Sequence, residues 1–320
     1  MGGSGWHRRE LPARSAQVTH NAAPVCGNLL PRCPLRNEMG GSLSFSVAQP
    51  FGAAASPGWA RQRIALTYLY GHGRLPDLQD PRRFTELVQM RKLYGRNPAM
   101  TALSDKLAVK QRVGLQLGNE WCVPTLWHGG SVPALPQIET SGFAKSRHGC
   151  NQTLRIGGTG DWERLCRLAP RWSAKPYGKW LDEWAYRDVP RGVLIEPLLG
   201  DGCSALTDYK IYVFGGRATH VQVHLERGKR HRWVLHDRDW NKLVLAQPDS
   251  PRRPSSLGAM LEAAEDLARD FSFARVDFYE VSGKPLFGEF SFYPGSGLDP
   301  FAADWIDFEL GSLWRGALGR

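Results

Sequence analysis

The sequence predicts an α+β protein in which helices come first and short strands follow. Apolar residues recur at helical spacing between Trp59 and about Leu117, whereas short strand-like runs dominate beyond residue 140. In this second part, strands and helices do not alternate regularly, which favours α+β layers over a doubly wound sheet. No internal repeat is visible in the chain.

Composition places the 320-residue chain among ordinary globular proteins, because 42% of its residues are hydrophobic and 22% are charged. This length is enough for one sizeable domain or two modest ones. No run approaches the roughly 18 apolar residues that a membrane-spanning helix needs, and the N-terminus lacks the apolar core of a secretory signal. We therefore expect a cytoplasmic protein without a transmembrane segment.

The cysteines form neither a CxxC pair nor a Cys/His pattern with zinc spacing. They are Cys26, Cys33, Cys122, Cys150, Cys166 and Cys203. Reduced thiols are the default in the cytosol, so neither a disulfide framework nor a structural zinc is expected.

The formal net charge of +10 favours anionic partners. Basic residues are spread along the chain, and the densest cluster spans residues 227–232, between two strand-like runs. This cluster reads equally well as a solvated hairpin turn or as a contact for phosphate or a polyanion. No recognised DNA-binding motif is present, so no specific nucleic-acid partner is expected.

The chain begins with a segment that shows no sustained hydrophobic period. Residues 1–58 are rich in Gly, Pro, Ser, Ala and Arg, and we expect a disordered or dispensable extension there. Residues 59–140 are expected to form a mainly helical region. One helix should begin near Pro81, and a second should open at Ser104, which can cap it, and continue through Val113.

The rest of the chain predicts eight strands and two helices. The helices span Ser256 to about Asp270 and Trp305 to Leu313, and the first has apolar residues at helical spacing. The strands are 143–145, 154–156, 193–196, 210–214, 219–225, 232–235, 273–279 and 286–292.

Two segments could contact a nucleotide. Lys145 closes a strand and is followed by a short turn that contains His148 and Gly149, so an ammonium and several backbone N–H groups could surround phosphates. A surface lysine before a turn is the alternative. The apolar strand that ends in Glu196 and continues to Leu199 could offer its end to an adenine ring, or it could be an ordinary buried strand.

A third segment combines opposite charges on one strand face. Asp208 and Lys210 are two residues apart, so they share a face of the strand that ends at Gly215-Gly216, which supplies a tight hairpin. A cross-strand salt bridge is the alternative to a functional role there.

The fourth segment carries the sharpest signal. Arg275 and Asp277 share one face of a strand, and Glu289 and Ser291 lie on the strand that follows a predicted hairpin turn. Two carboxylates on adjacent strands repel each other unless a cation lies between them, and magnesium is held by one or two carboxylates together with phosphate oxygens and water. An ion network of Arg275, Asp277 and Glu289 is the alternative.

A Gly-rich turn follows directly. It contains Gly295 and Ser296, and consecutive N–H groups in such a turn can bind the carboxylate of an acceptor. A plain loop is the alternative.

In order and spacing, these segments resemble the TupA-like ATP-grasp family, which is linked to cell-surface polysaccharide and teichuronopeptide synthesis. The resemblance covers residues 81–313. It rests on Phe84-Thr-Glu, Asp105-Lys106, Phe143-x-Lys145, His148-Gly149, Glu196-x-Leu-Leu199, Asp208-Tyr-Lys210, Arg275-Val-Asp277-x-Tyr279 and Phe287-Gly-Glu289. It implies an ATP-grasp fold, in which a lid subdomain at residues 141–200 and a C-terminal subdomain at residues 201–320 sandwich ATP.

The resemblance also implies a role for each matching residue. Magnesium would be held by Asp277 and Glu289, with Ser291 in place of the usual Asn, and Arg275 would stabilise charge on the transferring phosphoryl group or the acyl-phosphate. The acceptor would be held by Gly295 and Ser296. The nucleotide would be bound by Lys145, His148, Gly149, Glu196, Pro197, Leu199, Asp208 and Lys210, with Lys210 also catalytic.

The expected activity is ATP- and magnesium-dependent ligation of an acceptor carboxylate, from a small molecule or saccharide, to an amine. The carboxylate would attack the γ-phosphate, and the amine would then displace phosphate from the acyl-phosphate. A sugar or polyol kinase and a nonenzymatic polyanion-binding protein are the alternatives.

Overall fold

The computed structural model describes residues 58–200, 206–225, 232–244 and 251–319. The segment predicted to be disordered or dispensable lies outside these residues except for Gly58. The basic cluster at residues 227–232 also lies outside them, apart from Arg232 at the start of a strand.

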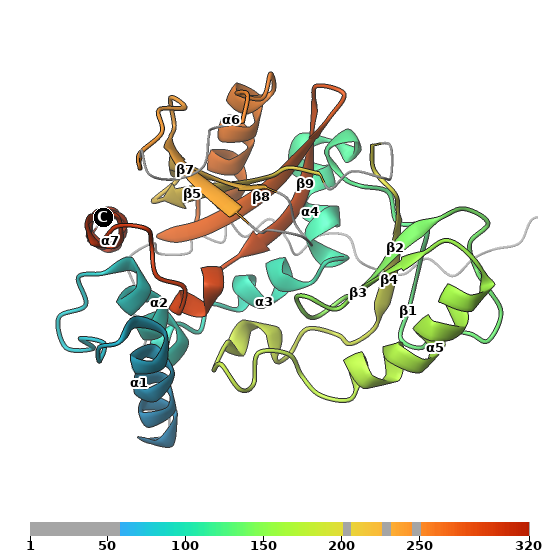
Figure 1. Cartoon of the computed structure of the whole chain (residues 1–320), viewed down its shortest axis with the longest axis horizontal. Coiled ribbons are helices and arrows are strands. Elements are labelled where there is room, and N and C mark those ends of the chain that lie inside the picture. The colour runs from blue at the N-terminus through green and yellow to red at the C-terminus, as the bar shows by residue number, and fades with distance from the viewer. Residues whose placement is uncertain (1–57, 201–205, 226–231, 245–250, 320) are drawn as a thin grey trace, which may run out of the picture. The chain divides into compact units, whose positions relative to one another are not determined.

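Helices occupy both ends of the described chain, and two more lie among the strands in between (Figure 1). They are α1 (Gly58–His72), α2 (Phe84–Tyr94), α3 (Pro98–Ser104), α4 (Ala108–Leu117), α5 (Thr159–Ser173), α6 (Leu257–Ala268) and α7 (Asp304–Leu318). Three short 3-10 helices are η1 (Asn119–Trp121), η2 (Trp184–Tyr186) and η3 (Pro294–Gly297).

The strands form two antiparallel sheets, one of four strands and one of five. The four-stranded sheet has the order β1-β4-β2-β3 and contains β1 (Trp127–Gly129), β2 (Gly142–Ser146), β3 (Thr153–Ile156) and β4 (Val193–Pro197). The five-stranded sheet has the order β7-β6-β5-β8-β9 and contains β5 (Asp208–Phe214), β6 (Arg217–Leu225), β7 (Arg232–Asp237), β8 (Phe273–Val281) and β9 (Lys284–Ser291). The α+β class predicted from the sequence is therefore confirmed.

One face of the five-stranded sheet packs against α6, which contacts β5, β6 and β8, and the other face carries both apolar and polar side chains (Figure 1). Strand alternation sends Ile211, Val221 and Val276 toward α6, where Met260 and Leu267 complete the core. On the opposite face, α2 and α7 cover only the end around Phe84, which contacts Phe273 and Trp314. The remainder of that face is left for the polar residues of strands β5 to β9.

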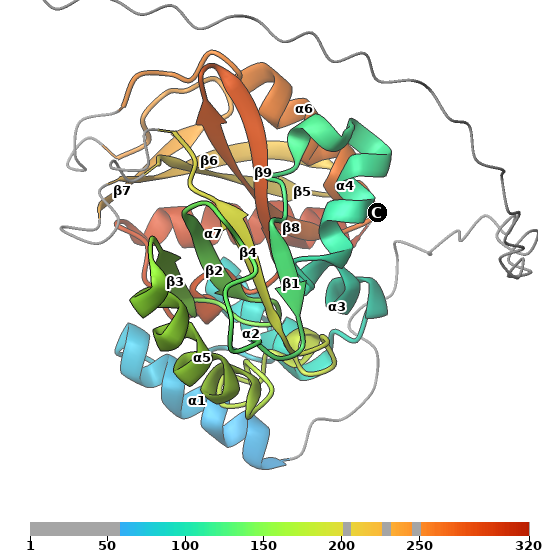
Figure 2. The same ribbon diagram turned by 90° about the vertical axis from the view of Figure 1, so that its right-hand side faces the viewer.

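The four-stranded sheet has a smaller core of its own. Helix α5 packs on it and buries Trp162, Leu165 and Ala169 against Ala144 and Ile195 (Figure 2). The segment between α3 and α4 contacts the turn that follows β2, where Arg147 donates two hydrogen bonds of 2.7 and 2.5 Å to Asp105. Further along the chain, Cys122 at the end of η1 reaches β9 through a bridge with Phe287.

All eight predicted strands are present, and the predicted helices at residues 81–90, 256–270 and 305–313 correspond to α2, α6 and α7. The prediction that Ser104 opens and caps a helix is wrong. Ser104 is the last residue of α3, its hydroxyl donates to the carbonyl of Met100, and α4 begins only at Ala108. A serine hydroxyl can bond backward along a helix as readily as it can cap the next one.

Helix α5, helix α3 and strand β1 were not predicted. The apolar positions of α5 have helical spacing, but Pro170 lies inside it and two glycines precede it, which hid the helix. Strand β1 has only three residues, and it is positioned by pairing with β4 and by the packing of Trp127 on Trp162. The division of the chain into subdomains at residues 140 and 200 stays a prediction.

Two further observations bear on the sequence-based expectations. In the part of the chain that the structure describes, no helix combines the length and hydrophobicity needed to span a bilayer. The three cysteines among these residues, Cys122, Cys150 and Cys166, are free thiols.

Candidate functional site

The polar face of the five-stranded sheet brings together residues from four strands. The register places Lys210 opposite Asp277 and, two pairs further and so on the same face, Tyr212 opposite Arg275. On the other side of β8, Asp277 lies opposite Glu289. The side-by-side placement of Asp277 and Glu289 expected from the hairpin is therefore present.

A bulge in β9 makes this register possible. Asp277 pairs with Glu289 while Phe278 pairs with Phe287, so Gly288 is the extra residue. A Cβ on Gly288 would lie 3.1 Å from the carbonyl oxygen of Asp277, closer than an ordinary contact. Glycine thus allows the two strands to approach closely beside the carboxylates.

Two cations bind Asp277, and all three side chains are almost completely shielded from solvent. Arg275 donates from Nε to Oδ1 and from Nη2 to Oδ2, both at 2.7 Å, and the Lys210 ammonium also donates to Oδ2. The side chains of Lys210, Asp277 and Arg275 are only 2%, 4% and 10% exposed. Burial acts to raise the pKa of Asp277, but Arg275 and Lys210 outweigh it and lower this pKa to about 2.

The same network also holds its two cations, Arg275 and Lys210, in place. Burial acts to lower the pKa of Arg275, but the charge of Asp277 opposes this and raises the pKa above its usual value. Lys210 has a second carboxylate within reach, since its Nζ lies 3.7 Å from Oδ2 of the buried Asp208. Two cations and two carboxylates therefore compensate one another at the centre of the sheet.

Glu289 differs from Asp277 because it reaches solvent. Its side chain is 36% exposed, and its nearest ion-pair contact is Arg275 Nη2 at 3.8 Å. Ser291, opposite Arg275, is buried. Within the described residues, no group of three or more His, Cys, Asp or Glu side chains could hold a metal ion by itself.

These residues fit magnesium in type, since it takes one or two carboxylates and fills its remaining positions with phosphate oxygens and water. Glu289 is the accessible ligand. Both oxygens of Asp277 are already bonded to Arg275 and Lys210. Oδ1 accepts a hydrogen bond from Arg275 alone, so its second lone pair could bind the ion.

A second carboxylate held by two cations lies on the four-stranded sheet. Glu196 of β4 receives Lys145 of β2 at 2.5 Å on Oε2, and Lys110 of α4 on Oε1. Burial acts to raise the pKa of Glu196, but Lys145 and Lys110 outweigh it and lower this pKa. Lys145 and Glu196, predicted separately as nucleotide contacts, therefore touch each other.

The turn after Lys145 is anchored from both sides. Nε2 of His148 lies 3.0 Å from the carbonyl oxygen of Trp172 at the end of α5, and burial lowers the pKa of this imidazole. Gly149 accepts a hydrogen bond of 2.5 Å from the Lys106 ammonium. His148 thus anchors the turn to α5, and a contact with nucleotide stays a prediction.

The Gly-rich turn η3 has an unusual backbone. Gly295, Ser296 and Gly297 all adopt the left-handed conformation, with φ of 53°, 57° and 62°, a state that costs a non-glycine residue such as Ser296 roughly 1 kcal/mol or more. The buried Lys92 ammonium donates to the carbonyl of Ser296 at 2.6 Å, and Gln89 donates to it at 3.0 Å. Charge-assisted bonds to the backbone therefore hold the turn in place.

In the turn predicted to bind the acceptor carboxylate, not every backbone N–H group is available to a ligand. The N–H of Ser296 donates to the carbonyl of Tyr293 at 2.8 Å. Gly295 faces a pocket, whereas the Ser296 side chain is buried behind the turn. Acceptor binding by these two residues stays a prediction.

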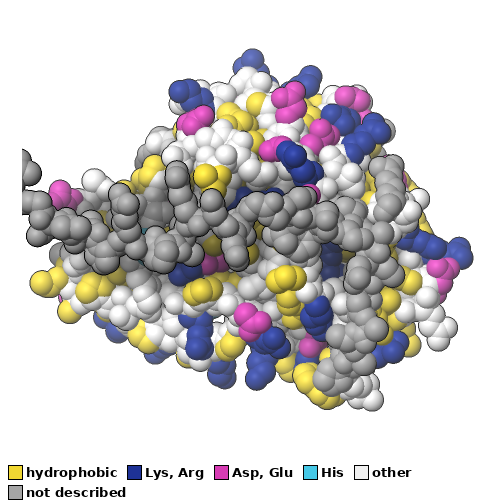
Figure 3. Space-filling view, turned by 180° about the vertical axis from the view of Figure 1, so that it is seen from behind, with side chains coloured by type: hydrophobic (Ala, Val, Ile, Leu, Met, Phe, Trp, Pro, Cys, Tyr) yellow, Lys and Arg dark blue, Asp and Glu magenta, His cyan; other side chains and the backbone are white. Residues whose placement is uncertain are grey.

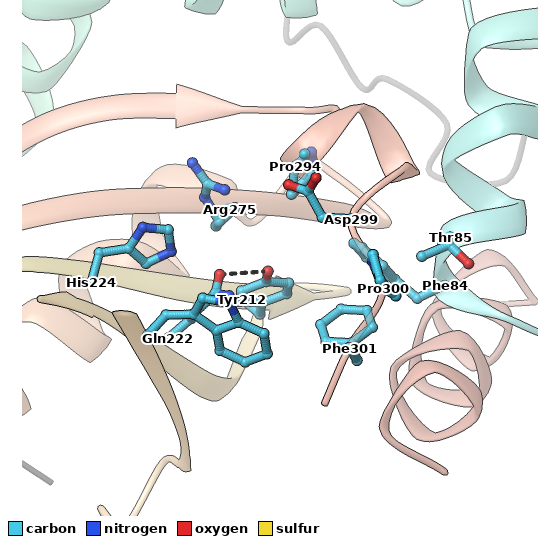
Figure 4. Close-up of a pocket in the computed structure, with 12 residues that line it drawn as sticks. Phe84, Thr85, Tyr212, Gln222, His224, Arg275, Pro294, Asp299, Pro300 and Phe301 are labelled. Atoms are coloured by element: carbon cyan, nitrogen blue, oxygen red, sulfur yellow. Dashed lines mark hydrogen bonds between the residues drawn. The ribbon is translucent and has the colours of Figure 1, made fainter. Parts of the chain in front are cut away.

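This pocket of about 390 Å³ lies on the polar face of the five-stranded sheet (Figure 4). Arg275 reaches it from the ion network, and Tyr212 donates to Oε1 of Gln222 at 3.1 Å beneath it. Burial raises the pKa of Tyr212 to about 12, although Arg275 lowers it. The pocket is lined by Phe84, Thr85, Tyr212, Gln222, His224, Trp233, Arg275, Pro294, Gly295, Asp299, Pro300 and Phe301.

The sequence analysis missed three of the residues that complete these sites. Lys110 compensates Glu196, and its only signal is a position four residues after Lys106, a helical spacing. Gln222 and Asp299 line the pocket. The alternation of polar and apolar residues along β6 indicates the face on which Gln222 lies. Asp299 lies in an irregular segment, and no sequence pattern indicates its position.

Residues 174–315 match a family model described as TupA-like ATPgrasp. This range includes the predicted residues from Glu196 to Ser296, but Lys145, His148 and Gly149 precede it. No curated protein matches the chain. The chain is similar in structure to D-alanine–D-alanine ligase from Bacillus anthracis, with 10% identity, a TM-score of 0.41 and coverage of 73% of this chain and 69% of that one.

Two further solved structures show comparable similarity. L-Amino acid ligase from Bacillus licheniformis is 12% identical with a TM-score of 0.45, over 73% of this chain and 53% of that one. D-Alanine–D-alanine ligase from Helicobacter pylori is 14% identical with a TM-score of 0.41, over 73% and 66%. At such values these similarities carry no argument about activity. The family match is a match of sequence, and it identifies residues 174–315 of this chain as a TupA-like ATP-grasp region.

Proposed function

We propose that this chain is an ATP- and magnesium-dependent ligase that activates an acceptor carboxylate as an acyl-phosphate and joins it to an amine. The observation that carries the proposal is the buried network of Lys210, Asp277 and Arg275. It holds two cations at fixed positions between the accessible Glu289 and the pocket. The TupA-like ATP-grasp match over this region supports the same conclusion.

Preorganised cations suit phosphoryl transfer, because its catalysis rests on positioning and on compensation of phosphate charge. Arg275 lies between Asp277 and the pocket, so its guanidinium can face a phosphoryl group without leaving the sheet. Lys210 can share its charge in the same way. Asp277 and Glu289, with the Ser291 hydroxyl, would hold the magnesium ion, which neutralises phosphate charge when bound.

The cluster on the four-stranded sheet would contact the nucleotide. Both lysines are already oriented by Glu196, so their ammonium groups can meet phosphates at little cost in side-chain entropy. Since the Glu196 carboxylate is engaged by these lysines, adenine recognition would rest on the backbone at the end of β4, with Pro197 and Leu199. We assign Asp208 to the ribose and His148 with Gly149 to the turn above the phosphates.

The two substrates would then react in sequence. An acceptor carboxylate oxygen attacks the γ-phosphorus, ADP leaves, and an acyl-phosphate forms. The amine nitrogen attacks the acyl carbon, the bond from carbon to the phosphate oxygen breaks, and phosphate leaves as the amine loses its proton. Arg275 would stabilise the developing charge in both steps. We propose a place for this ligation in cell-surface polysaccharide or peptide-polymer synthesis.

The charge on one face of the molecule gives the polyanion alternative little support. On the face shown in Figure 3, lysines and arginines are interspersed with aspartates and glutamates and do not gather into one patch. A kinase would use the same residues, and product analysis separates it from a ligase. A kinase leaves a phosphate ester on a hydroxyl, whereas a ligase requires an amine and releases phosphate.

Calorimetric titration with a nonhydrolysable ATP analogue, with and without magnesium, tests the proposal. Wild-type protein should bind the analogue more tightly with magnesium. Glu289→Gln should reduce this magnesium effect at least tenfold, because a neutral amide is a poor magnesium ligand. Glu289 is partly exposed, so this variant should fold normally.

Glu262→Gln is the matched control, since Glu262 is exposed on α6 and lies away from the polar face. It should bind like the wild type. Absence of nucleotide binding by folded wild-type protein would contradict the proposed function.

A further inference from the structure

The pocket beside Arg275 has a chemical character that the proposed function does not explain. We propose that it binds the amine substrate, and that this substrate is an amino acid with an aromatic or large apolar side chain. Asp299 would receive its ammonium group, Gln222 its carboxylate, and Trp233 with Phe301 its side chain. This assignment rests on the proposed ligase function and adds the identity of the second substrate.

Asp299 is built into the turn that closes the pocket. A Cβ on Gly295 would lie 2.3 Å from Oδ2 of Asp299, so the carboxylate occupies the space of a side chain at that position. Glycine also suits this position because its φ of 53° is left-handed. The conformation of the turn and the position of the carboxylate therefore depend on each other.

A carboxylate at this turn favours a cation as its neighbour. An acceptor carboxylate bound to Gly295 would lie against Asp299 and be repelled by it. An ammonium group would be attracted instead, and a charge-assisted hydrogen bond to Asp299 would orient it. Asp299 and Arg275 both line the pocket, and Figure 4 shows them on the same side of it, above Tyr212 and Phe301. An amine held there would be adjacent to the cation that we assign to the reacting phosphoryl group.

The opposite wall is aromatic. Trp233 of β7 and Phe301 pack edge to face, with ring centroids 6.4 Å apart, and both are only partly buried. Phe301 rests in turn on the buried Phe84, at 6.0 Å between centroids. Partly exposed rings backed by a rigid core form a suitable wall for an aromatic or large apolar group.

Gln222 supplies a directional donor between these two ends. Its Oε1 accepts the hydroxyl hydrogen of Tyr212, so its amide N–H groups are the part presented to other partners. Gln222 is buried and lies opposite Lys210 in the sheet register, which fixes its position. An oxygen acceptor such as the carboxylate of an amino acid fits this donor.

The test is equilibrium binding by calorimetry with both enantiomers of phenylalanine as probes, using the full chain with and without magnesium and the nonhydrolysable ATP analogue. At least one enantiomer should bind. Alanine, which lacks the ring, and 3-phenylpropionate, which lacks the ammonium, should each bind at least tenfold more weakly. A charged hydrogen bond contributes about 1.5–3 kcal/mol, which corresponds to a loss of about 10- to 100-fold in affinity.

Two variants test whether the amino acid binds in this pocket. Asp299→Asn should weaken phenylalanine binding at least tenfold and leave 3-phenylpropionate unchanged. Phe301→Leu should reduce the preference for phenylalanine over leucine. The matched control is Asp304→Asn, because Asp304 is an exposed carboxylate that pairs with Arg83 outside the pocket. This control should bind phenylalanine like the wild type.

The proposal is overturned if neither enantiomer binds with or without nucleotide, or if 3-phenylpropionate binds as tightly as phenylalanine. Unchanged affinity in Asp299→Asn would also overturn it. Nucleotide binding is measured in the same titrations. Bound nucleotide without bound amino acid would reject the amine pocket and leave the ligase proposal standing, whereas failure of nucleotide binding would reject the ligase proposal itself.

Discussion

The two sheets each hold a buried carboxylate between two cations, but they build this arrangement differently. Asp277 is compensated by neighbours within one sheet, Arg275 on its own strand and Lys210 on the next. Glu196 is compensated by Lys145 from its sheet and by Lys110 from a helix. One network is therefore fixed by strand register alone, and the other also depends on where α4 packs.

Solvent access follows the same division. Lys210 is 2% exposed, whereas Lys110 and Lys145 are 15% and 28% exposed. Buried ions without partners are costly, while partly exposed ones can be hydrated. The network in the five-stranded sheet should consequently be rigid and essential for stability, and the one around Glu196 should tolerate loss of its carboxylate and respond more readily to a ligand.

The largest expected effect is the loss of Asp277. Asp277→Ala leaves Lys210 and Arg275 buried with one carboxylate fewer and should lower the free energy of unfolding by about 3–5 kcal/mol. Urea denaturation measures this value. A loss of unfolding free energy below about 1 kcal/mol would mean that Lys210 and Arg275 find other partners without cost. The proposed difference between the Asp277 and Glu196 networks would then be wrong.

The second prediction concerns Glu196. Glu196→Gln removes the charge that holds Lys110 and Lys145, but both lysines can reach water, so the free energy of unfolding should fall by only about 1–2 kcal/mol. The same denaturation experiment applies, with Glu163→Gln on the exposed face of α5 as control. A loss as large as that of Asp277→Ala would remove the distinction between the networks.

The smallest expected effect is a pH dependence located on the five-stranded sheet. Burial lowers the pKa of His220 from 6.5 to about 4. Between these values the unfolded chain binds the proton and the folded chain does not, so stability should decrease as the pH falls from 6.5 to 4. Asp277 adds to this loss only below about pH 5, where the unfolded carboxyl begins to bind a proton that the folded carboxyl, with its pKa of about 2, does not bind.

Thermal or urea unfolding at pH 7, 5.5 and 4 measures this dependence, and His220→Gln should reduce it by on the order of 1 kcal/mol. His220 lies 3.6 Å from Glu309, which would stabilise its charged form and make the effect smaller than burial alone implies. An identical pH profile in His220→Gln would assign the acid sensitivity to another group.

The sequence alone determined the strands from β2 to β9 and the faces that their residues share. A period of two places Lys210 with Tyr212, and Arg275 with Asp277, whatever the rest of the chain does. A tight glycine turn joins β5 to β6, and the short hairpin between β8 and β9 brings Glu289 beside Asp277. Local geometry and side-chain periodicity act over a few residues, so they can be read directly from the chain.

Only the tertiary structure decided which charges meet across distant segments. Lys110 reaches Glu196 because a helix packs beside a strand far along the chain, and neither segment carries a signal for the other. Asp299 meets Gly295 through an irregular turn whose left-handed backbone has no period to detect. Such contacts depend on packing and on the close approach of individual atoms, which only the folded chain establishes.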